Sequence, residues 1–544
     1  MKKYILIFVT AILIGVLVWA TQRRAPVERR QLLLMHDMTT PLQEPPPNGD
    51  PNMTGKSESA ADEAVEEPGE GQLNTESYKK IIDNVFRSPM KSPLSTFSID
   101  VDRAAYSNVR RFLQVGQHPP ADAVRVEEMI NYFTYDYIEP VDGNPFSINT
   151  EVGACPWNKD HRFVHVGLQV RAIPTENLPA SNLVFLIDVS GSMNDPYRLP
   201  LVKESFNMLV DQLRDRDHVG IVVYAGAAGV VLEPTSGAEK ETIRNAIGRL
   251  EAGGSTAGGE GLRLAYQLAR KSFKVGGNNR VIIATDGDFN VGESSDEAME
   301  ALIEEEREEG IFLTVLGYGM GNYKDSKLEI LADKGNGNYA YIDNAPEARK
   351  ILVNEFGGTL FTIAKDVKVQ VEFDPARVQA YRLIGYENRA LRDDDFNNDK
   401  KDAGELGSGH TVTALYEIIP VGTKSRYFDG DTVPHPGRTP RQSVFADEMM
   451  TVKLRYKTPD GHVSKVLAHP VSGRMKSYDE TSENFRWACS VAGFGMLLRS
   501  SPYVNGFSYD QVIALAENSK GKDPDGHRTE FISLVQAYGT LSRR

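Results

Sequence analysis

The chain has 544 residues, of which 40% are hydrophobic and 25% are charged, and its formal net charge is −14. This length exceeds one ordinary domain and predicts two to four folded units with hydrophobic cores of their own. The negative charge argues against a nucleic-acid-binding protein, because phosphate backbones are bound by basic surfaces.

The N-terminus has the layout of an export signal. Two lysines at residues 2–3 precede an uncharged apolar run, Tyr4–Ala20, which is typical of a signal peptide or signal anchor over residues 1–22. A small-residue cleavage rule would accept Val18 and Ala20, whereas the arginines that follow resist translocation. We therefore expect a protein of the cell envelope, periplasmic or extracytoplasmic, that is either secreted or anchored by this segment.

Of the next two segments, the first is predicted to be disordered and the second to be helical. Residues 23–75 are rich in Pro, Gly, Glu and Ser and lack a hydrophobic period, so they predict a disordered acidic linker. Residues 76–140 carry short amphipathic patterns over 103–115 and 123–133, which predict an N-terminal helical segment.

Alternation of apolar and polar residues predicts strands on both sides of residues 181–356. It appears in residues 141–180, as in Val164–Val170, and returns in residues 357–474, as in Val412–Ile418. Each such strand has one buried face that needs a core. We predict one β-sandwich to which both segments contribute strands; two separate β units are an equally workable alternative.

The segment between these strands has a different pattern. Short continuous apolar runs such as Leu183–Ile187 and Val281–Ala284 alternate with helical patterns, which predicts a parallel α/β sheet over residues 181–356. The fold class is therefore α/β, with this domain inserted in the β-sandwich. Residues 475–544 return to helical periodicity and predict a C-terminal helical domain.

The chain has two cysteines, Cys155 and Cys489, too few for a disulfide framework or a cysteine-rich zinc site. We expect two buried free thiols. A single bridge between them is the alternative in an oxidising compartment.

Three motifs in the α/β segment carry oxygen ligands. LVFLIDVSGSM ends one strand in Asp188, Ser190 and Ser192, VIIATDGDFN ends another in Asp286, and EAGGSTAGGEGL places Thr256 in a Gly-rich loop. If the two strands are neighbours, these loops line the crevice beyond their carboxyl ends, where doubly wound sheets bind ligands. Hydroxyls and carboxylates are hard donors suited to Mg²⁺, Mn²⁺ or Ca²⁺. They are too few to close the shell, which leaves an open position for an incoming carboxylate.

These motifs resemble the von Willebrand factor A (VWA) family and its metal-ion-dependent adhesion site. The resemblance implies a doubly wound, mainly parallel, Rossmann-like sheet. It also implies that Ser190, Ser192 and Thr256 contact the metal directly, whereas Asp188 and Asp286 act mainly through water. An Asp or Glu of a partner protein would complete the coordination.

The flanking sequences are similar to bacterial YfbK-like exported proteins. STFSIDVDRAAYSNVRRFL precedes the domain and DAGELGSGHTVTALYEI follows it, so the likeness covers roughly Tyr78 to the end of the chain. We therefore predict an exported, metal-dependent protein-binding module that is not an enzyme. The alternatives are a metal-assisted hydrolase, which needs a base beside the metal, and a scaffold whose metal is only structural.

Other polar residues predict ordinary structural roles. Asp195 and Asp288 are expected to cap helices or form turns, and an outer ion is the alternative. His161 and His165 lie too far apart on one strand to share a metal. The acidic run Glu304–Glu309 predicts a solvated helix face.

Overall fold

The computed structural model describes residues 76–141, 143–254, 258–287, 296–320, 324–355, 361–399, 401, 403–429, 447–459, 461 and 463–543. The predicted export signal and acidic linker lie outside these residues. Among the described helices, none is both long and apolar enough to span a bilayer.

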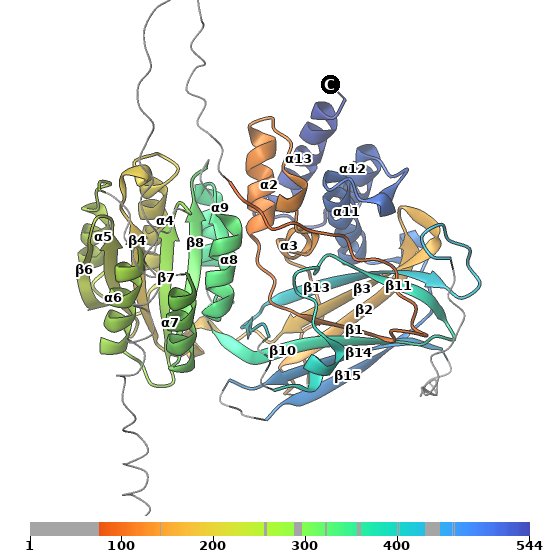
Figure 1. The fold of residues 1–544 in the computed structure, drawn as a ribbon, viewed down its shortest axis with the longest axis horizontal. Coiled ribbons are helices and arrows are strands. Elements are labelled where there is room, and N and C mark those ends of the chain that lie inside the picture. Colours follow the sequence, from red (N-terminus) through yellow and green to blue (C-terminus); the bar gives the residue numbers. More distant parts are fainter. Residues whose placement is uncertain are drawn as a thin grey trace, which may run out of the picture. The chain divides into compact units, whose positions relative to one another are not determined.

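The α/β domain is built on a six-stranded sheet (Figure 1). Its strands, in sheet order, are β6 (Ala228–Ser236), β5 (His218–Tyr224), β4 (Ser181–Asp188), β7 (Asn278–Thr285), β8 (Ile311–Tyr318) and β9 (Tyr339–Ile342). All neighbouring pairs are parallel except the pair of β6 with β5, which is antiparallel. β4 and β7 are buried along their whole length because helices cover both faces of the sheet.

Two layers of helices enclose this sheet. They are α4 (Leu199–Gln212), α5 (Lys240–Gly248), α6 (Gly258–Lys271), α7 (Asp296–Glu308), α8 (Asp325–Lys334) and α9 (Ala345–Arg349). The alternating residues of β4 separate the layers: Phe185 and Ile187 pack in one core with α4, α5 and α9, and Val184 and Leu186 in the other with α6, α7 and α8. The predicted doubly wound, mainly parallel fold is confirmed.

The remaining strands form one β-sandwich. One sheet has the order β1 (Leu94–Ser98), β10 (Thr362–Phe373), β14 (Glu448–Lys457), β15 (Lys465–Ser472), with β12 (Leu406–Gly407) paired to β10. The other has the order β11 (Val378–Ile384), β13 (Thr411–Pro420), β3 (Asn158–Val170), β2 (Phe146–Cys155). Both sheets contribute to a single core, so the sandwich is fed by strands from both sides of the α/β domain. The alternative of two separate β units is wrong.

Helices from the two ends of the chain pack together. They are α2 (Ala104–Gln114), α3 (Val126–Asn131), α11 (Glu483–Leu498), α12 (Tyr509–Glu517) and α13 (His527–Leu541). Their apolar faces share one core that also receives Phe163 of β3 and Leu415 of β13. Both cysteines lie in this core as buried free thiols, as expected.

Buried arginines join the α/β domain to its neighbours. We call the surface of the α/β domain formed by α8, β9 and α9 the docking face. At this surface Arg110 contacts Asp343 and Glu347, and Arg125 contacts Asp325. The other contacts are those of Arg389 with Asp102, Glu329 and Asp333. All three arginines are at most 6% exposed. The docking face is therefore a polar interface that is shielded from water.

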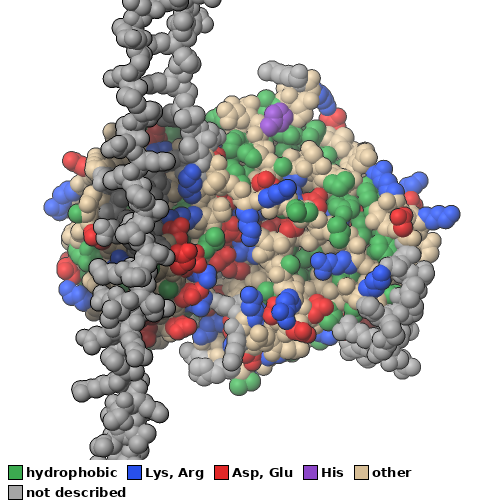
Figure 2. All heavy atoms as spheres, in the orientation of Figure 1, with side chains coloured by type: hydrophobic (Ala, Val, Ile, Leu, Met, Phe, Trp, Pro, Cys, Tyr) green, Lys and Arg blue, Asp and Glu red, His purple; other side chains and the backbone are tan. Residues whose placement is uncertain are grey.

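Two details differ from the sequence analysis. β1 was not predicted, because its five residues are too short to show a clear alternation. The acidic run on α7 is only partly solvated: acidic side chains gather over α7 and α8 (Figure 2), yet Glu306 is 2% exposed and pairs with Arg270. A helix face can therefore bury one carboxylate of an acidic run when a neighbouring helix supplies an arginine.

Candidate metal centre

The first two motifs converge at one edge of the six-stranded sheet. β4 and β7 are paired in register from Ser181 opposite Asn278 to Ile187 opposite Ala284, so Asp188 and Asp286 emerge side by side from their ends. After β4 the chain continues into β5, its neighbour on one side of the sheet, whereas β7 lies on the other side of β4. The winding direction therefore reverses between β4 and β7. The two strands are thus neighbours, as the sequence argument required, and the point where the winding reverses lies at their carboxyl ends. We call it the metal-site edge.

The loop after β4 is held by hydrogen bonds to Asp188. The backbone N–H of Ser190 donates to Asp188 Oδ1 at 2.9 Å, and Thr285 Oγ1 donates to Asp188 Oδ2 at 3.3 Å. The hydroxyl oxygens of Ser190 and Ser192 are 3.0 Å apart. Ser190 is buried and Ser192 is exposed, so this pair of hydroxyls connects the buried carboxylate to the surface.

The Gly-rich loop lies against the same turn. The Gly191 N–H donates to the Gly254 carbonyl at 3.0 Å, and the Gly253 N–H donates to the Val189 carbonyl at 2.7 Å. Gly254 has a φ of +84°, a left-handed conformation that favours glycine and lets the two backbones approach closely. Thr256 lies two residues further along, outside the described residues. Its contact with the other ligands stays a prediction.

Two buried carboxylates make this edge electronegative. Asp188 and Asp286 both have no exposed surface. Burial raises the pKa of Asp188 to about 6 against the opposing effect of hydrogen bonds from Ser190, and the nearby Asp286 carboxylate raises it further. Adjacent buried carboxylates are costly unless a cation accompanies them.

Arg198 supplies one such cation, and the sequence analysis missed it. Its Nη1 is 2.8 Å from Asp286 Oδ2 and donates to the Ser192 carbonyl at 2.6 Å, while Nη2 donates to the Met320 carbonyl at 2.8 Å. The guanidinium therefore joins the loops after β4, β7 and β8. Gly319, at φ +75°, is shaped around it, since a Cβ there would lie 2.4 Å from Arg198 Nε.

One sequence signal could have drawn attention to Arg198. It is the N-cap residue of α4, where the helix dipole disfavours a positive charge and where Ser, Thr, Asp or Asn is usual. An arginine at such a position suggests that its charge is needed elsewhere. Gly319, directly after β8, likewise leaves room for this side chain.

The donor set fits a hard divalent cation. Asp188, Ser190, Ser192 and Asp286 offer only carboxylate and hydroxyl oxygens, the ligands of Mg²⁺, Mn²⁺ and Ca²⁺, and no imidazole or thiolate. Asp195 takes the expected turn role, accepting a hydrogen bond from the Tyr197 N–H at 2.8 Å. Asp288 lies outside the described residues.

Other acidic and histidine clusters have protein partners. Asp102, Glu128 and Glu329 come close together in the docking face, but Arg125 and Arg389 lie among them. The β3 histidines are engaged separately, His161 with Glu417 and His165 with Tyr137. They do not form a pair, as expected from their spacing.

Family models match three consecutive parts of the chain. A von Willebrand factor type A domain model matches residues 182–354, and a von Willebrand factor model matches residues 72–165. The C-terminal model of the uncharacterized protein YfbK matches residues 358–541.

Similar proteins come from several bacteria. The uncharacterized protein YfbK of Escherichia coli K12 is 43% identical over 474 residues, which are 85% of this chain and 81% of that protein. The uncharacterized protein sll0103 of Synechocystis is 32% identical over 188 residues, 34% of this chain and 43% of that protein. Among solved structures, a von Willebrand factor type A protein from Catenulispora acidiphila is 16% identical and covers 69% of this chain and 87% of its own, with a TM-score of 0.40.

Proposed function

This chain belongs to the YfbK family of proteins with a VWA domain, and we propose that it binds a partner protein through a divalent metal at the metal-site edge. The observation that carries this proposal is the convergence of Asp188, Asp286 and the two serine hydroxyls at the ends of adjacent strands. Mg²⁺ is the first candidate, with Mn²⁺ or Ca²⁺ as alternatives.

Each side chain has a distinct role in this proposal. The hydroxyls of Ser190, Ser192 and Thr256 would hold the ion directly, and the carboxylates of Asp188 and Asp286 would support it mainly through water. The bound ion would supply an electrophilic position that accepts an Asp or Glu carboxylate of the partner. Because Ser192 is exposed while Asp188 is buried, the open position would face solvent, where a partner can reach it.

We favour binding over catalysis for a physical reason. A metal-assisted hydrolase needs a base beside the metal to take a proton from water. Both carboxylates beside the proposed ion already accept hydrogen bonds from the protein, Asp286 from the Arg198 guanidinium and Asp188 from the Ser190 N–H and the Thr285 hydroxyl, which favours a supporting role over that of a base. We further propose that the chain acts outside the cytoplasmic membrane, on the strength of the apolar run Tyr4–Ala20 that follows two lysines.

The central test is isothermal titration of the full chain with Mg²⁺, followed by partner capture with and without chelator. Ser190→Ala and Asp286→Ala should weaken Mg²⁺ binding, and chelator should release the captured partner until Mg²⁺ is restored. Thr256→Ala should weaken the complex without unfolding the domain. Equal Mg²⁺ affinity in wild type and in all three variants would place the ion elsewhere.

Export has a separate test. Protease added to intact spheroplasts should degrade the chain if its bulk lies outside the cytoplasmic membrane. Protection until the cells are lysed would contradict this part of the proposal and leave the metal-dependent binding untouched.

A further inference from the structure

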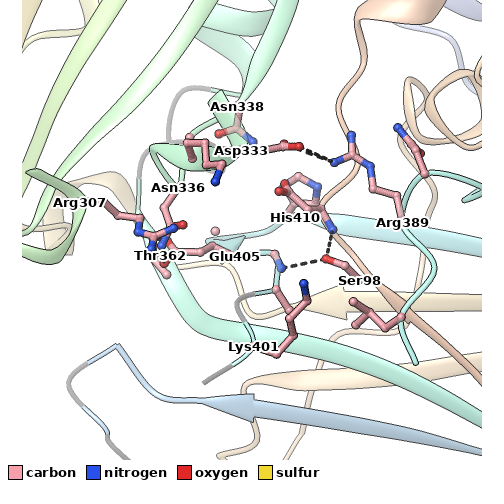
Figure 3. Close-up of a pocket in the computed structure, with 18 of the residues that line it drawn as sticks. Ser98, Arg307, Asp333, Asn336, Asn338, Thr362, Arg389, Lys401, Glu405 and His410 are labelled. Carbon is pink, nitrogen blue, oxygen red and sulfur yellow. Dashed lines mark hydrogen bonds and ion pairs between the residues drawn. The ribbon is translucent and has the colours of Figure 1, made fainter. Parts of the chain in front are cut away.

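A cavity of about 410 Å³ lies between the VWA domain and the β-sandwich (Figure 3). Residues of β7, α7 and the turn after α8 line it on the VWA side, and residues around Ser98, β12 and 388–391 line it on the sandwich side. Arg307 and Thr362 lie at the left of the view, Glu405 near its centre with Asp333 above it, and Arg389 at the right. This volume is within the range of small-molecule sites, roughly 300–1,000 Å³.

Arg280, on β7, is the least compensated charge in this cavity. Its side chain is 2% exposed, and its Nη1 donates one hydrogen bond, to Thr314 Oγ1 at 2.8 Å. Among the described residues, its Nε has no hydrogen-bond partner, and no carboxylate lies within ion-pair distance of the guanidinium. The Phe312 ring, 5.5 Å away, gives a weaker cation–π contact. Burial lowers the pKa of Arg280 to about 10, and the more distant Glu405 only partly opposes this.

The carboxylates of the cavity already have partners. Glu405 accepts hydrogen bonds from Asn336 Nδ2 at 3.0 Å and from Thr362 Oγ1 at 2.7 Å. Asp333 pairs with Arg389, 3.3 Å away. Turning either carboxylate toward Arg280 would therefore break existing contacts.

Two other cations that line the cavity have carboxylate partners of their own. Arg389 pairs with Asp102, Glu329 and Asp333, and Lys334 lies beside Glu300 and Glu304. His410 adds no charge at neutral pH, because burial lowers its pKa to about 3. Arg280 is therefore the buried cation of this cavity that has no ion-pair partner among the described residues. A buried cation without a counter-charge is strongly unfavourable, so the position suits one negative group.

We propose that this cavity binds a small anion carrying a carboxylate or phosphate group, with Arg280 as its counter-charge. The guanidinium offers planar paired N–H donors that match both groups. Because the cavity walls come from the VWA domain and from the sandwich, the bound anion bridges the two. It stabilises the state in which they are docked, since it binds that state alone.

The test is calorimetric titration of the full chain with inorganic phosphate and, separately, with citrate, against chloride at matched ionic strength. One of the two anions should bind at a single site and raise the midpoint of thermal unfolding; which one binds distinguishes the phosphate from the carboxylate. Arg280→Met should weaken that binding about tenfold or more, the effect of losing a hydrogen bond between charged groups. Arg280→Lys should retain part of the affinity.

A matched control is Arg263→Met, which removes an exposed arginine of α6 and should leave anion binding unchanged. Folding of Arg280→Met is checked by circular dichroism; it should persist, because an apolar side chain of similar length often replaces a buried charge without loss. The proposal is overturned if neither anion binds the wild-type chain, or if Arg280→Met binds the anion as tightly as wild type does.

Discussion

In the VWA domain, buried charges are compensated in different ways at the docking face and at the metal-site edge. At the docking face, each arginine lies among carboxylates from several elements, as Arg110 does between Asp343, Glu347 and Glu530. At the metal-site edge, Arg198 is paired with Asp286, while Asp188 receives hydrogen bonds from the neutral donors Ser190 and Thr285. At the docking face, the positive and negative charges are balanced within the chain. At the metal-site edge, negative charge remains that an added cation can balance.

The largest expected effect comes from breaking the docking face. Arg110→Met leaves Asp343 and Glu347 buried without their main cation, and removing one partner of a buried ion pair costs about 3–5 kcal/mol. The midpoint of urea unfolding should fall accordingly. Arg244→Met, which removes a partly exposed arginine paired with the exposed Asp211, should change stability by less than about 1 kcal/mol. Similar losses for both variants would contradict the contrast between buried and exposed pairs.

An added ion should stabilise the metal-site edge, whereas it should have no such effect on the docking face. Mg²⁺ that binds only the folded chain stabilises it by about 2.7 kcal/mol at a hundredfold excess over the dissociation constant. Ser190→Ala and Asp286→Ala should reduce this stabilisation in thermal unfolding. Ser236→Ala, on the edge strand β6, is the matched control and should respond like wild type. If Mg²⁺ stabilised both site variants as much as wild type, the assignment of the metal to this edge would be wrong.

Alkaline pH should weaken the docking face. Burial raises the pKa of Asp102 to about 7 and that of Glu128 to about 8, so the folded chain holds protons that the unfolded chain has released. Stability from these groups is fully present below their unfolded pKa values, near 4, and is lost as pH rises through about 7 to 8. Over one pH unit near neutrality the loss is at most about 1.4 kcal/mol for each group. Glu128→Gln should flatten the curve of unfolding midpoint against pH; an unchanged curve would exclude Glu128 as the source.

The smallest expected effect concerns Arg198. Its guanidinium already occupies one oxygen of Asp286, so it should compete with the metal for that carboxylate and repel the ion. Arg198→Met should tighten Mg²⁺ binding about fivefold, corresponding to roughly 1 kcal/mol for a unit charge and a doubly charged ion about 8 Å apart in water. Arg198→Lys, which keeps the charge, should bind Mg²⁺ nearly as wild type does. Weaker Mg²⁺ binding by Arg198→Met would show instead that the arginine mainly positions Asp286.

The sequence by itself determined the α/β domain and its candidate ligands. Continuous apolar runs marked the buried strands, and Asp188, Ser190 and Asp286 directly follow two of them. Strand ends and the loops after them are local features, so residue type and spacing were enough to select these candidate ligands. That they share one edge follows from the pairing of β4 with β7, which the sequence analysis could only assume. The alternation in residues 141–180 and 357–474 likewise predicted sandwich strands, but not whether they share one core.

The tertiary structure alone decided the features that depend on distant contacts. β1 joins β10 although more than 250 residues separate them in the chain, and no periodicity in five residues reveals that pairing. The same holds for Arg198, which meets Asp286 across 88 positions, and for Arg280, whose burial follows from strands and loops that pack around it. Whether a charge is compensated depends on which side chains the packing places beside it, and a sequence pattern does not contain that information.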